Sequence, residues 1–210
     1  MKYLSILLIV LAVFSCSEKN ENSFQSLFNG KNFQGWEGDT LNTWKIENGM
    51  ITGGSLDELV PHNEFLCTQE AYANFDLRLK IKLTGNEGFI NSGIQFRSSR
   101  LSEPDYEMTG YQADFGEDYW ASLYDESRRN KTLIAPDSVQ VQDWININEW
   151  NDYRVLAVDR HIQLFVNGHQ TVDYREPDET IPQNGLIGLQ IHGGGKAKVF
   201  FKDIEIKRLP

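Results

Sequence analysis

Strict alternation of apolar and polar residues is the feature of this sequence that most constrains its fold. In residues 75–83, five apolar side chains alternate with aspartate, arginine and lysine. A period of two places successive side chains on opposite faces of a β-strand, so this segment predicts a strand with one buried and one solvated face. Alternation of this kind recurs along the chain, and no amphipathic helical repeat of useful length follows residue 24. The sequence therefore predicts an all-β protein.

Short turns join the predicted strands. Asn48-Gly49 is a strong hairpin signal between strands at residues 44–46 and 50–52. Residues 153–174 predict a three-stranded meander, and the final strand, residues 197–209, shifts its alternation near Lys202, which predicts a β-bulge. We expect one antiparallel two-sheet sandwich of jelly-roll type over residues 24–210, with a loop at residues 135–148 and with Trp36, Trp44 and Trp150 in the core.

The N-terminus is typical of a bacterial lipoprotein signal. An apolar run over residues 4–14 is too short to span a bilayer and ends just before Ser15-Cys16. We expect a signal peptide at residues 1–15, lipidation of Cys16 and a polar tether at residues 16–23; the alternatives are a plain secretory signal and a short anchor helix. This interpretation places the protein in the cell envelope, in the periplasm or at the outer-membrane surface, and its membrane contact is through the lipid alone.

Composition excludes several classes of function. The formal net charge is −10 and no cluster of lysine and arginine stands out, which argues against nucleic-acid binding. Of the two cysteines, an acylated Cys16 cannot form a disulfide, and Cys67 in its apolar setting predicts a buried, inert thiol. The chain has no HExxH motif, calcium loop, phosphate-binding loop or dinucleotide fingerprint, so we predict no metal and no cofactor.

Residues 106–129 combine acidic and aromatic side chains in a strand-like frame, which is typical of a surface that meets a ligand. Asp125 and Glu126 are adjacent, so in an extended chain they face opposite ways, and we favour Glu126 as the site residue. Three aromatic residues are candidates for stacking on a sugar ring, and a basic residue closes the rim. These four predicted substrate-binding residues are Tyr119, Trp120, Tyr124 and Arg128.

Three predicted strands also carry polar pairs at positions i and i+2, each opposite an apolar set. The pairs are Gln95 and Arg97, Gln112 and Asp114, and Gln190 and His192. Residues two apart in a strand share a face, so all six would stand on one polar face if the three strands belong to one sheet. The alternatives are a merely solvated face, a structural ion pair between Asp114 and Arg97, and a structural role for His192.

Several segments of the sequence resemble the 3-keto-disaccharide hydrolase domain family, over nearly the whole mature chain. The segments are residues 24–36, 44–51, 91–97 (Asn-Ser-Gly-Ile-Gln-Phe-Arg), 185–193 and 199–204. The resemblance implies the concanavalin A-like lectin/glucanase sandwich, which agrees with the strand pattern. It also implies cleavage of glycosides that carry a ketone at C3.

A C3 ketone acidifies the C2 proton, so a base can remove it and the C1 substituent can depart by elimination before water adds. We hypothesise catalytic roles for Asp114, Glu126 and His192, with Asp114 or Glu126 as the base and His192 as an acid or binder. Arg97 and Gln112 would bind the enolate or hydroxyl oxygens, with Gln95 and Gln190 as further substrate-binding residues. The alternatives are a carbohydrate-binding module of a surface glycan-utilisation system, which is not catalytic, and a structural surface lipoprotein.

Overall fold

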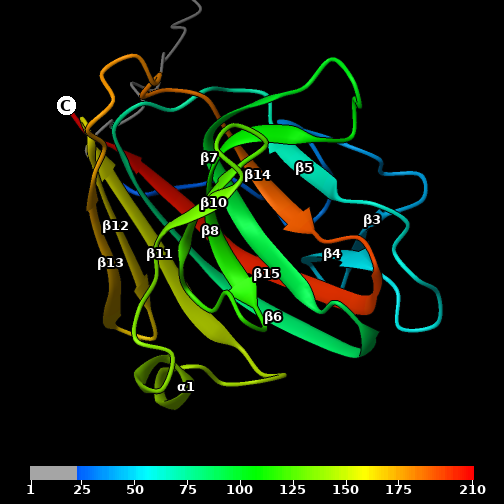
Figure 1. Ribbon diagram of the computed structural model, residues 1–210. Coiled ribbons are helices and arrows are strands. Elements are labelled where there is room, and N and C mark those ends of the chain that lie inside the picture. Colours follow the sequence, from blue (N-terminus) through cyan, green and yellow to red (C-terminus); the bar gives the residue numbers. More distant parts are fainter. Residues whose placement is uncertain (1–22) are drawn as a thin grey trace, which may run out of the picture.

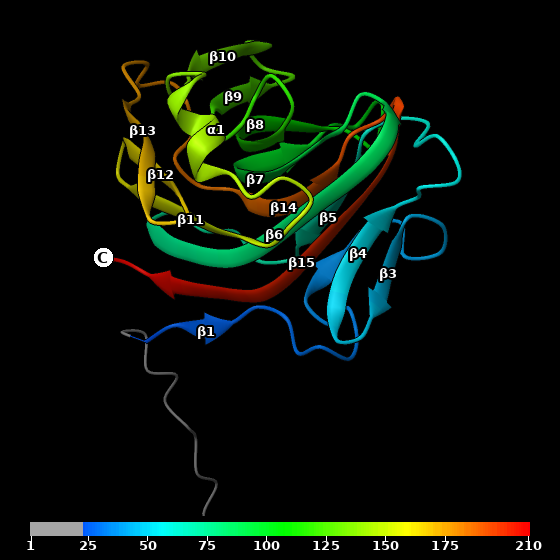
Figure 2. The ribbon, with the colours of Figure 1, turned by 90° about the horizontal axis from the view of Figure 1, so that it is seen from below.

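The computed structural model describes residues 23–210, which form two antiparallel sheets packed face to face (Figure 1 and, from below, Figure 2). The eight-stranded sheet has the order β13 (His169–Arg175), β12 (His161–Val166), β11 (Asn151–Val158), β6 (Phe75–Gly88), β15 (Gly195–Arg208), β4 (Met50–Gly54) and β3 (Trp44–Glu47), with β1 (Gln25–Ser26) paired to β15. The seven-stranded sheet has the order β10 (Lys131–Ile134), β9 (Leu123–Glu126), β8 (Met108–Gly116), β7 (Asn91–Arg100), β14 (Leu186–Ile191), β5 (Glu64–Thr68) and β2 (Trp36–Glu37). The predicted all-β sandwich is confirmed.

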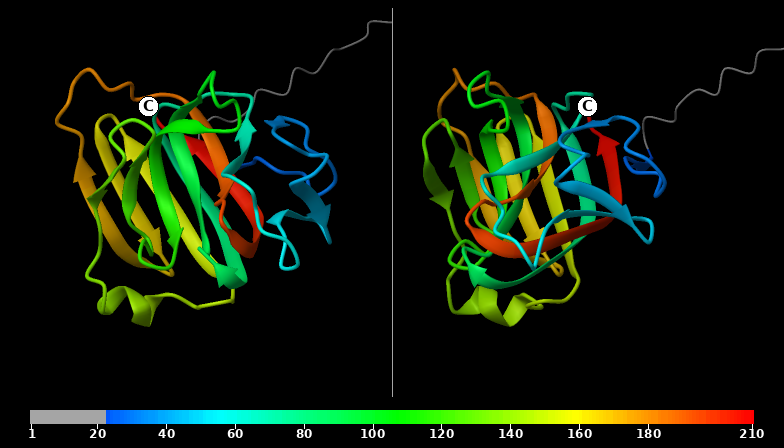
Figure 3. Two further views of the ribbon diagram at one scale, coloured as in Figure 1. Left: turned by 45° about the vertical axis from the view of Figure 1, so that its right-hand side comes forward. Right: turned by 90° about the vertical axis from the view of Figure 1, so that its right-hand side faces the viewer.

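The core lies between the two sheets. The two views in Figure 3 show the sheets packed against each other. In β6 the residues Phe75, Leu77, Leu79, Ile81 and Leu83 are buried, and they face alternating apolar side chains of the other sheet. The Phe75 ring meets Phe96 of β7 edge to face at 6.2 Å. Burial of apolar surface on this scale is the main favourable term in folding, which explains why period-two alternation predicted the strands correctly.

The turn predictions are confirmed where the chemistry of the turn demands a particular residue. Asn48 and Gly49 have φ angles of 51° and 76°, the left-handed pair that a two-residue hairpin turn requires. Strands β11, β12 and β13 form the predicted meander. In β15 the register against β6 shifts between Lys202 and Glu205, at the predicted bulge.

Two local expectations are wrong. Residues 135–148 were predicted to be a loop, but they contain one helical turn, α1 (Gln140–Trp144), whose start is held by two backbone N–H groups that donate to Asp137 Oδ1 at 3.0 Å. Trp150 was expected in the core together with Trp36 and Trp44. Only Trp36 and Trp44 are buried; Trp150 packs edge to face on Phe200, outside the core cluster, with Lys202 over its ring.

The predicted signal peptide, Cys16 and all but the last residue of the tether lie outside the described residues. Within residues 23–210, no helix reaches the length and apolar character that a bilayer crossing requires. Cys67, the one cysteine in the described part of the chain, is buried against the Met108 sulfur at 3.3 Å, and burial raises the pKa of its thiol to about 11. The prediction of an inert thiol is confirmed.

A seven-residue connection between β7 and β8, residues 101–107, is called the strap below. It reaches the residues just before β5, two strands away from β7 in the sheet. The Tyr106 ring stacks on His62 with centroids 3.8 Å apart, and Asn63 Nδ2 donates to Glu107 Oε2 at 3.0 Å. Asn63 Oδ1 in turn accepts from the Gly193 amide at 3.1 Å, so the strap is tied to the end of β14 as well.

Candidate functional site

A pocket of about 120 Å³ opens on the outer face of the seven-stranded sheet. Its lining comes from β7, β8 and β9 and from the connections beside them. The lining residues are Phe89, Asn91, Gln112, Asp114, Tyr119, Tyr124, Glu126 and His192. Two carboxyl groups, two amides, one imidazole and three aromatic rings therefore converge in one small polar hollow.

Alternation along β8 explains why these groups face outward. Tyr111, Ala113 and Phe115 enter the core, so Gln112 and Asp114 stand on the opposite face. Gln112 lies opposite Gln95 of β7 and Tyr124 of β9, and Asp114 lies opposite Gly93. A Cβ atom at Gly93 would come within 3.0 Å of the Gln112 side chain, so only glycine leaves room for that side chain to lie over β7.

A chain of hydrogen bonds orients the amides in the floor of the pocket. Ser98 Oγ donates to Gln95 Oε1 at 2.8 Å, and Gln95 Nε2 donates to Gln112 Oε1 at 3.1 Å. Gln112 Nε2 then donates to Asp114 Oδ1 at 3.0 Å, and Asn91 Nδ2 donates to the same oxygen at 3.3 Å. Each amide in this chain is thus held by its neighbour, which fixes the groups before any ligand arrives.

Burial shifts the acid–base behaviour of the pocket. Desolvation raises the pKa of Asp114 to about 8, and the nearby charge of Glu126 adds to the shift. Desolvation also raises the pKa of Glu126 to about 7, with a further contribution from the charge of Glu107 in the strap. Both carboxyl groups therefore hold their protons to a higher pH than exposed carboxyl groups do.

The pKa of His192 shifts in the opposite direction, because burial lowers the pKa of an imidazole. Its Nδ1 lies 2.6 Å from the Gly193 carbonyl oxygen, which can only accept, so Nδ1 carries the proton and Nε2 keeps a free lone pair. The Phe89 ring packs edge to face against the imidazole at 4.6 Å. The pocket thus contains a neutral base beside two carboxyl groups that hold their protons at mildly acidic pH.

The structure brings six of the predicted site residues together in this pocket. They are Gln112, Asp114, Tyr119, Tyr124, Glu126 and His192. Gln95 does not line the pocket, but its Nε2 donates to Gln112 Oε1 and so orients that side chain. Asp125 points to the opposite face from Glu126, because adjacent strand residues alternate. The roles assigned to these residues stay predictions.

Arg97 does not belong to this face, so the expectation that all six paired residues share it is wrong. The residue has a left-handed φ of 48°, and the pairing of β7 with β8 shifts register between Phe96 and Ser99. This bulge carries the guanidinium to the rim of the sandwich, where it donates to the carbonyl oxygens of Ala73 and Asp159 and to Gln183. It cannot reach Asp114 while it holds those partners.

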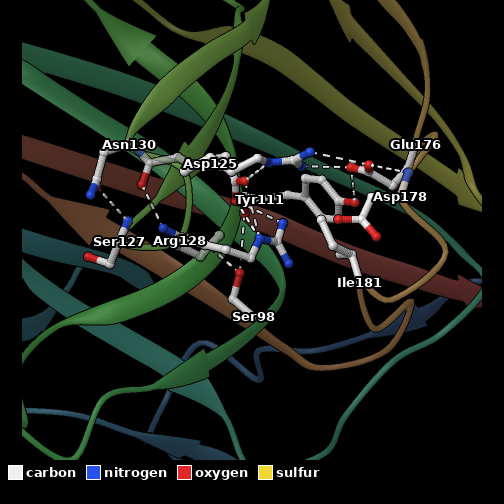
Figure 4. Close-up of polar contacts among 12 residues, drawn as sticks. Ser98, Tyr111, Asp125, Ser127, Arg128, Asn130, Glu176, Asp178 and Ile181 are labelled. Atoms are coloured by element: carbon white, nitrogen blue, oxygen red, sulfur yellow. Dashed lines mark hydrogen bonds and ion pairs between the residues drawn. The ribbon is translucent and has the colours of Figure 1, made fainter.

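Trp120, Arg128 and Gln190 also fall outside the pocket lining. Trp120 packs edge to face on the core residue Phe115 at 4.9 Å. Arg128 lies 4.5 Å from the centre of the Tyr111 ring and donates to Asp125, in the network that Figure 4 shows. Gln190 is completely buried in β14, two residues before His192.

Two lining residues, Phe89 and Asn91, were missed by the sequence reasoning. Asn91 has the same parity as Gly93 and Gln95 in the alternation of β7, so extension of that pattern by two residues would have placed it on the polar face. Phe89 lies in the short connection between β6 and β7, and nothing in the pattern there separates a lining ring from a core ring.

A larger hollow of about 550 Å³ lies on the outer face of the eight-stranded sheet. Its basic side chains already have partners: Arg154 and Arg78 both bind the carboxylate of Asp76, and Lys80 pairs with Asp152. Such paired surface charges stabilise a sheet face and leave little that converges on a ligand. The smaller polar pocket is therefore the better candidate for a functional site.

The sandwich and its pocket define a protein with a glycosyl hydrolase-like or carbohydrate-binding fold. The chain belongs to the 3-keto-alpha-glucoside-1,2-lyase-like domain family, whose sequence model matches residues 23–207. The family resemblance read from the sequence is thereby confirmed. A comparison with proteins of curated function finds no match to this chain.

Solved structures share the architecture at low sequence identity. A candidate glycosyl hydrolase from Parabacteroides distasonis is 23% identical, with a TM-score of 0.66 over 96% of this chain and 99% of that chain. A carbohydrate-binding module from Bacillus subtilis is 14% identical, with a TM-score of 0.63 over 82% and 95%. A β-glucanase from Bacillus licheniformis is 11% identical, with a TM-score of 0.56 over 90% and 98%. At these identities the likeness concerns the fold alone.

Proposed function

We propose that this protein cleaves glycosides that carry a ketone at C3, by elimination across C1 and C2 followed by hydration. One observation carries the proposal: His192, with a free Nε2, lies in the same pocket as two carboxyl groups whose pKa values burial has raised. Elimination next to a ketone needs one base and two proton donors. The description of the family, with its 1,2-lyase-like activity, supports the same bond change.

In the proposed reaction, His192 Nε2 takes the proton from C2 and the C–H electron pair forms the C1–C2 double bond. The C1–O bond breaks, and the departing oxygen takes the proton of Glu126. Asp114, which is protonated, donates a hydrogen bond to the ketone oxygen as negative charge develops on it. Water then adds to C1 and gives its proton to Glu126, while His192 returns a proton to C2. Both groups end in their starting states.

These roles exchange the ones that the sequence suggested. A carboxylate was the expected base and His192 an acid or binder, but burial lowers the pKa of the imidazole and raises the pKa of both carboxyl groups. A buried carboxyl group is a better proton donor and a poorer base than an exposed one at neutral pH. We therefore assign His192 as the base, Glu126 as the acid and Asp114 as the donor to the ketone oxygen.

The test compares a 3-keto-glucoside with its unoxidised parent. Release of the aglycone from the keto form alone, with solvent deuterium at C2 of the sugar product, is the expected result. His192→Ala should reduce kcat by at least about a hundredfold, the usual contribution of a general base. His161→Ala is the matched control, because His161 pairs with Asp173 on the other sheet and should leave kcat unchanged.

Cleavage of the unoxidised parent at a similar rate would overturn the proposal, because that substrate has no acidic C2 proton. Tight sugar binding with no turnover would support the second candidate function, a carbohydrate-binding module. Tyr119 and Tyr124 favour that candidate, since their rings meet edge to face at 6.1 Å beside the pocket and offer apolar faces to a sugar.

We also propose that the chain is a lipoprotein of the cell envelope, acylated at Cys16. The sequence pattern around Ser15-Cys16 supports this location, and the polar tether gives the sandwich distance from the lipid.

A further inference from the structure

Asn91 carries a hydrogen-bond acceptor that has no partner among residues 23–210. The residue is only 2% exposed, yet its Oδ1 makes no hydrogen bond, while its Nδ2 donates to Asp114 Oδ1 at 3.3 Å. Asn91 lines the pocket. A buried polar atom left without a partner is costly, and when it borders a pocket, a ligand that donates to it removes that cost.

Asp114 presents the complementary group beside it. Its Oδ1 accepts from both Gln112 Nε2 and Asn91 Nδ2, whereas its Oδ2 has no hydrogen-bond partner among the described residues. An oxygen that accepts two N–H groups is a poor place for the acid proton, so the proton of the neutral carboxyl sits on Oδ2. Asp114 therefore offers an O–H donor, next to the acceptor of Asn91.

The orientations of the two amides support this assignment. Gln112 Oε1 accepts from Gln95 Nε2, which leaves Gln112 Nε2 as the group that faces Asp114. If the Asn91 amide were reversed, its oxygen would lie 3.3 Å from Asp114 Oδ1, and the proton of Asp114 would have to sit on that oxygen, which already accepts from Gln112 Nε2, to join the two. In the observed orientation each of the three amide nitrogens, Gln95 Nε2, Gln112 Nε2 and Asn91 Nδ2, donates to an acceptor.

We propose that Asn91 Oδ1 and the protonated Oδ2 of Asp114 form a donor–acceptor pair that recognises an α-hydroxy ketone in the ligand. The ketone oxygen at C3 accepts from Asp114, and a hydroxyl on a neighbouring carbon, C2 or C4, donates to Asn91. This inference rests on the proposed function and names Asn91 as a specificity-determining residue of the same site. An isolated ketone satisfies only Asp114, whereas an α-hydroxy ketone satisfies both groups with two separate oxygens.

The charged groups around the pair indicate that the ligand is uncharged. None of the eight lining residues is lysine or arginine, and the guanidinium groups of Arg97 and Arg128 are bound elsewhere. A carboxylate, sulfate or phosphate on the sugar would face Glu126 with no cation to balance it. The pair therefore selects neutral keto-sugars over acidic ones.

The test uses the 3-keto form of 1,5-anhydroglucitol, which has no leaving group at C1 and cannot be cleaved. Its affinity, and those of its 2-deoxy and 4-deoxy analogues, are measured by calorimetry with the wild-type protein and with Asn91→Ala. One analogue should bind wild type about tenfold to a hundredfold more weakly than the parent sugar, as should Asn91→Ala with the parent sugar. For that analogue, Asn91→Ala should reduce the binding affinity little further, because the missing hydroxyl and the missing acceptor belong to the same contact.

Asn151→Ala is the matched control, since Asn151 is a buried asparagine of the other sheet whose amide bonds with Asn146, Glu149 and Asn167, none of which lines the pocket. It should bind the keto-sugar as the wild type does. Equal affinity of wild type and Asn91→Ala, or losses that simply add, would overturn the role of Asn91, with Oδ1 then binding only water. Coupled losses with no cleavage of any 3-keto-glucoside would retain the pair and reject the proposed activity. No binding of any of the three sugars would reject both.

Discussion

Asp114 is a residue that the fold retains at a cost. Its side chain is 3% exposed in an otherwise hydrogen-bonded floor, and burial raises the pKa of its carboxyl to about 8. The unfolded chain would ionise this group near pH 4. A carboxyl that is neutral when folded and charged when unfolded opposes folding over the interval between those two pKa values. Such a penalty is typical of a group kept for its chemistry.

Asp114→Asn should stabilise the protein at pH 8. Between pH 4 and 8 the unfolded state binds fewer protons than the native state, so the stability of the wild type falls as the pH rises. Asparagine cannot ionise, and its Nδ2 takes the place of the protonated Oδ2. Urea denaturation should show a gain of at most about 5 kcal/mol at pH 8, which corresponds to a shift of about four pKa units, and almost none at pH 4. A difference that does not change with pH would contradict the assigned protonation.

The pH dependence of catalysis should report Glu126. Burial raises its pKa to about 7, and the proposed acid must be protonated, so kcat/KM should fall about tenfold per pH unit above 7. Burial lowers the pKa of His192 below 6.5, so the acidic limb lies below that value. Glu126→Gln should reduce the rate and move the alkaline limb from about 7 to about 8, where Asp114 loses its proton. An alkaline limb that stays near 7 in this variant would assign it to another group.

At the scale of elements, β9 is held by an ion network on the face opposite the pocket. Asp125 is fully buried and pairs with Arg128 and Arg129, and Arg129 Nη2 also binds Glu176 Oε2 at 2.7 Å. Tyr111 Oη donates to the same Glu176 oxygen at 2.7 Å (Figure 4). Because Tyr124 and Glu126 alternate with Asp125 along the strand, this network also positions one wall of the pocket.

Arg129→Ala should destabilise the protein by about 3–5 kcal/mol at pH 7, because it leaves two buried carboxylates without their shared cation. In the folded state desolvation acts to raise the pKa of Glu176, but hydrogen bonds from Arg129 and Tyr111 outweigh it and lower the pKa to about 2. The stabilisation it provides is present above its unfolded pKa near 4.3 and is lost as the pH falls toward 2, so the effect of the variant should shrink over that range.

Arg128→Ala is the matched control for this measurement by denaturant unfolding. It also removes a partner of Asp125, but it leaves Arg129 to hold both carboxylates. A loss from Arg128→Ala as large as that from Arg129→Ala would show that Glu176 contributes little to the network.

Alternation of side chains predicted most elements and half of the site. It placed Gln112 and Asp114 on one face and separated Glu126 from Asp125, because a strand has only two faces. It failed at Arg97, where a bulge with positive φ breaks the period, and a bulge depends on register with a partner strand that one sequence does not reveal.

The sequence did not predict which aromatic rings line the pocket, for a similar reason. Tyr119 and Trp120 lie in the connection between β8 and β9, where the direction of each side chain follows from the turn and not from a period. Tyr119 therefore lines the pocket while Trp120 packs on Phe115. The directions of the pKa shifts also depend on burial in three dimensions, so the exchange of roles between His192 and the carboxyl groups required the structure.

At the scale of the whole molecule, the two sheets differ in what their outer faces carry. The eight-stranded sheet carries the long strands β6 and β15, whose outward charges are largely paired, and the seven-stranded sheet carries the pocket. Neither the fold nor its structural neighbours decide between catalysis and binding, since both occur on this architecture. Catalysis and binding must therefore be distinguished by the chemistry of the eight lining residues.

Localisation is the prediction that belongs to the whole chain. Cys16→Ala should remove the acylation site, so the protein should move from the membrane fraction to the soluble fraction and lose incorporation of labelled palmitate. Cys67→Ala is the control, because that thiol is buried and inert, and it should leave the fractionation unchanged. A membrane-bound Cys16→Ala protein without label would indicate a plain signal segment that is retained as an anchor.

The pairing of β1 decides where the described chain begins relative to the pocket. This first strand pairs with β15 in the eight-stranded sheet, so the chain enters on the layer opposite the pocket (Figure 2). The first strand therefore leaves the mouth of the pocket uncovered. A ligand can then enter the pocket without displacing the described N-terminal residues.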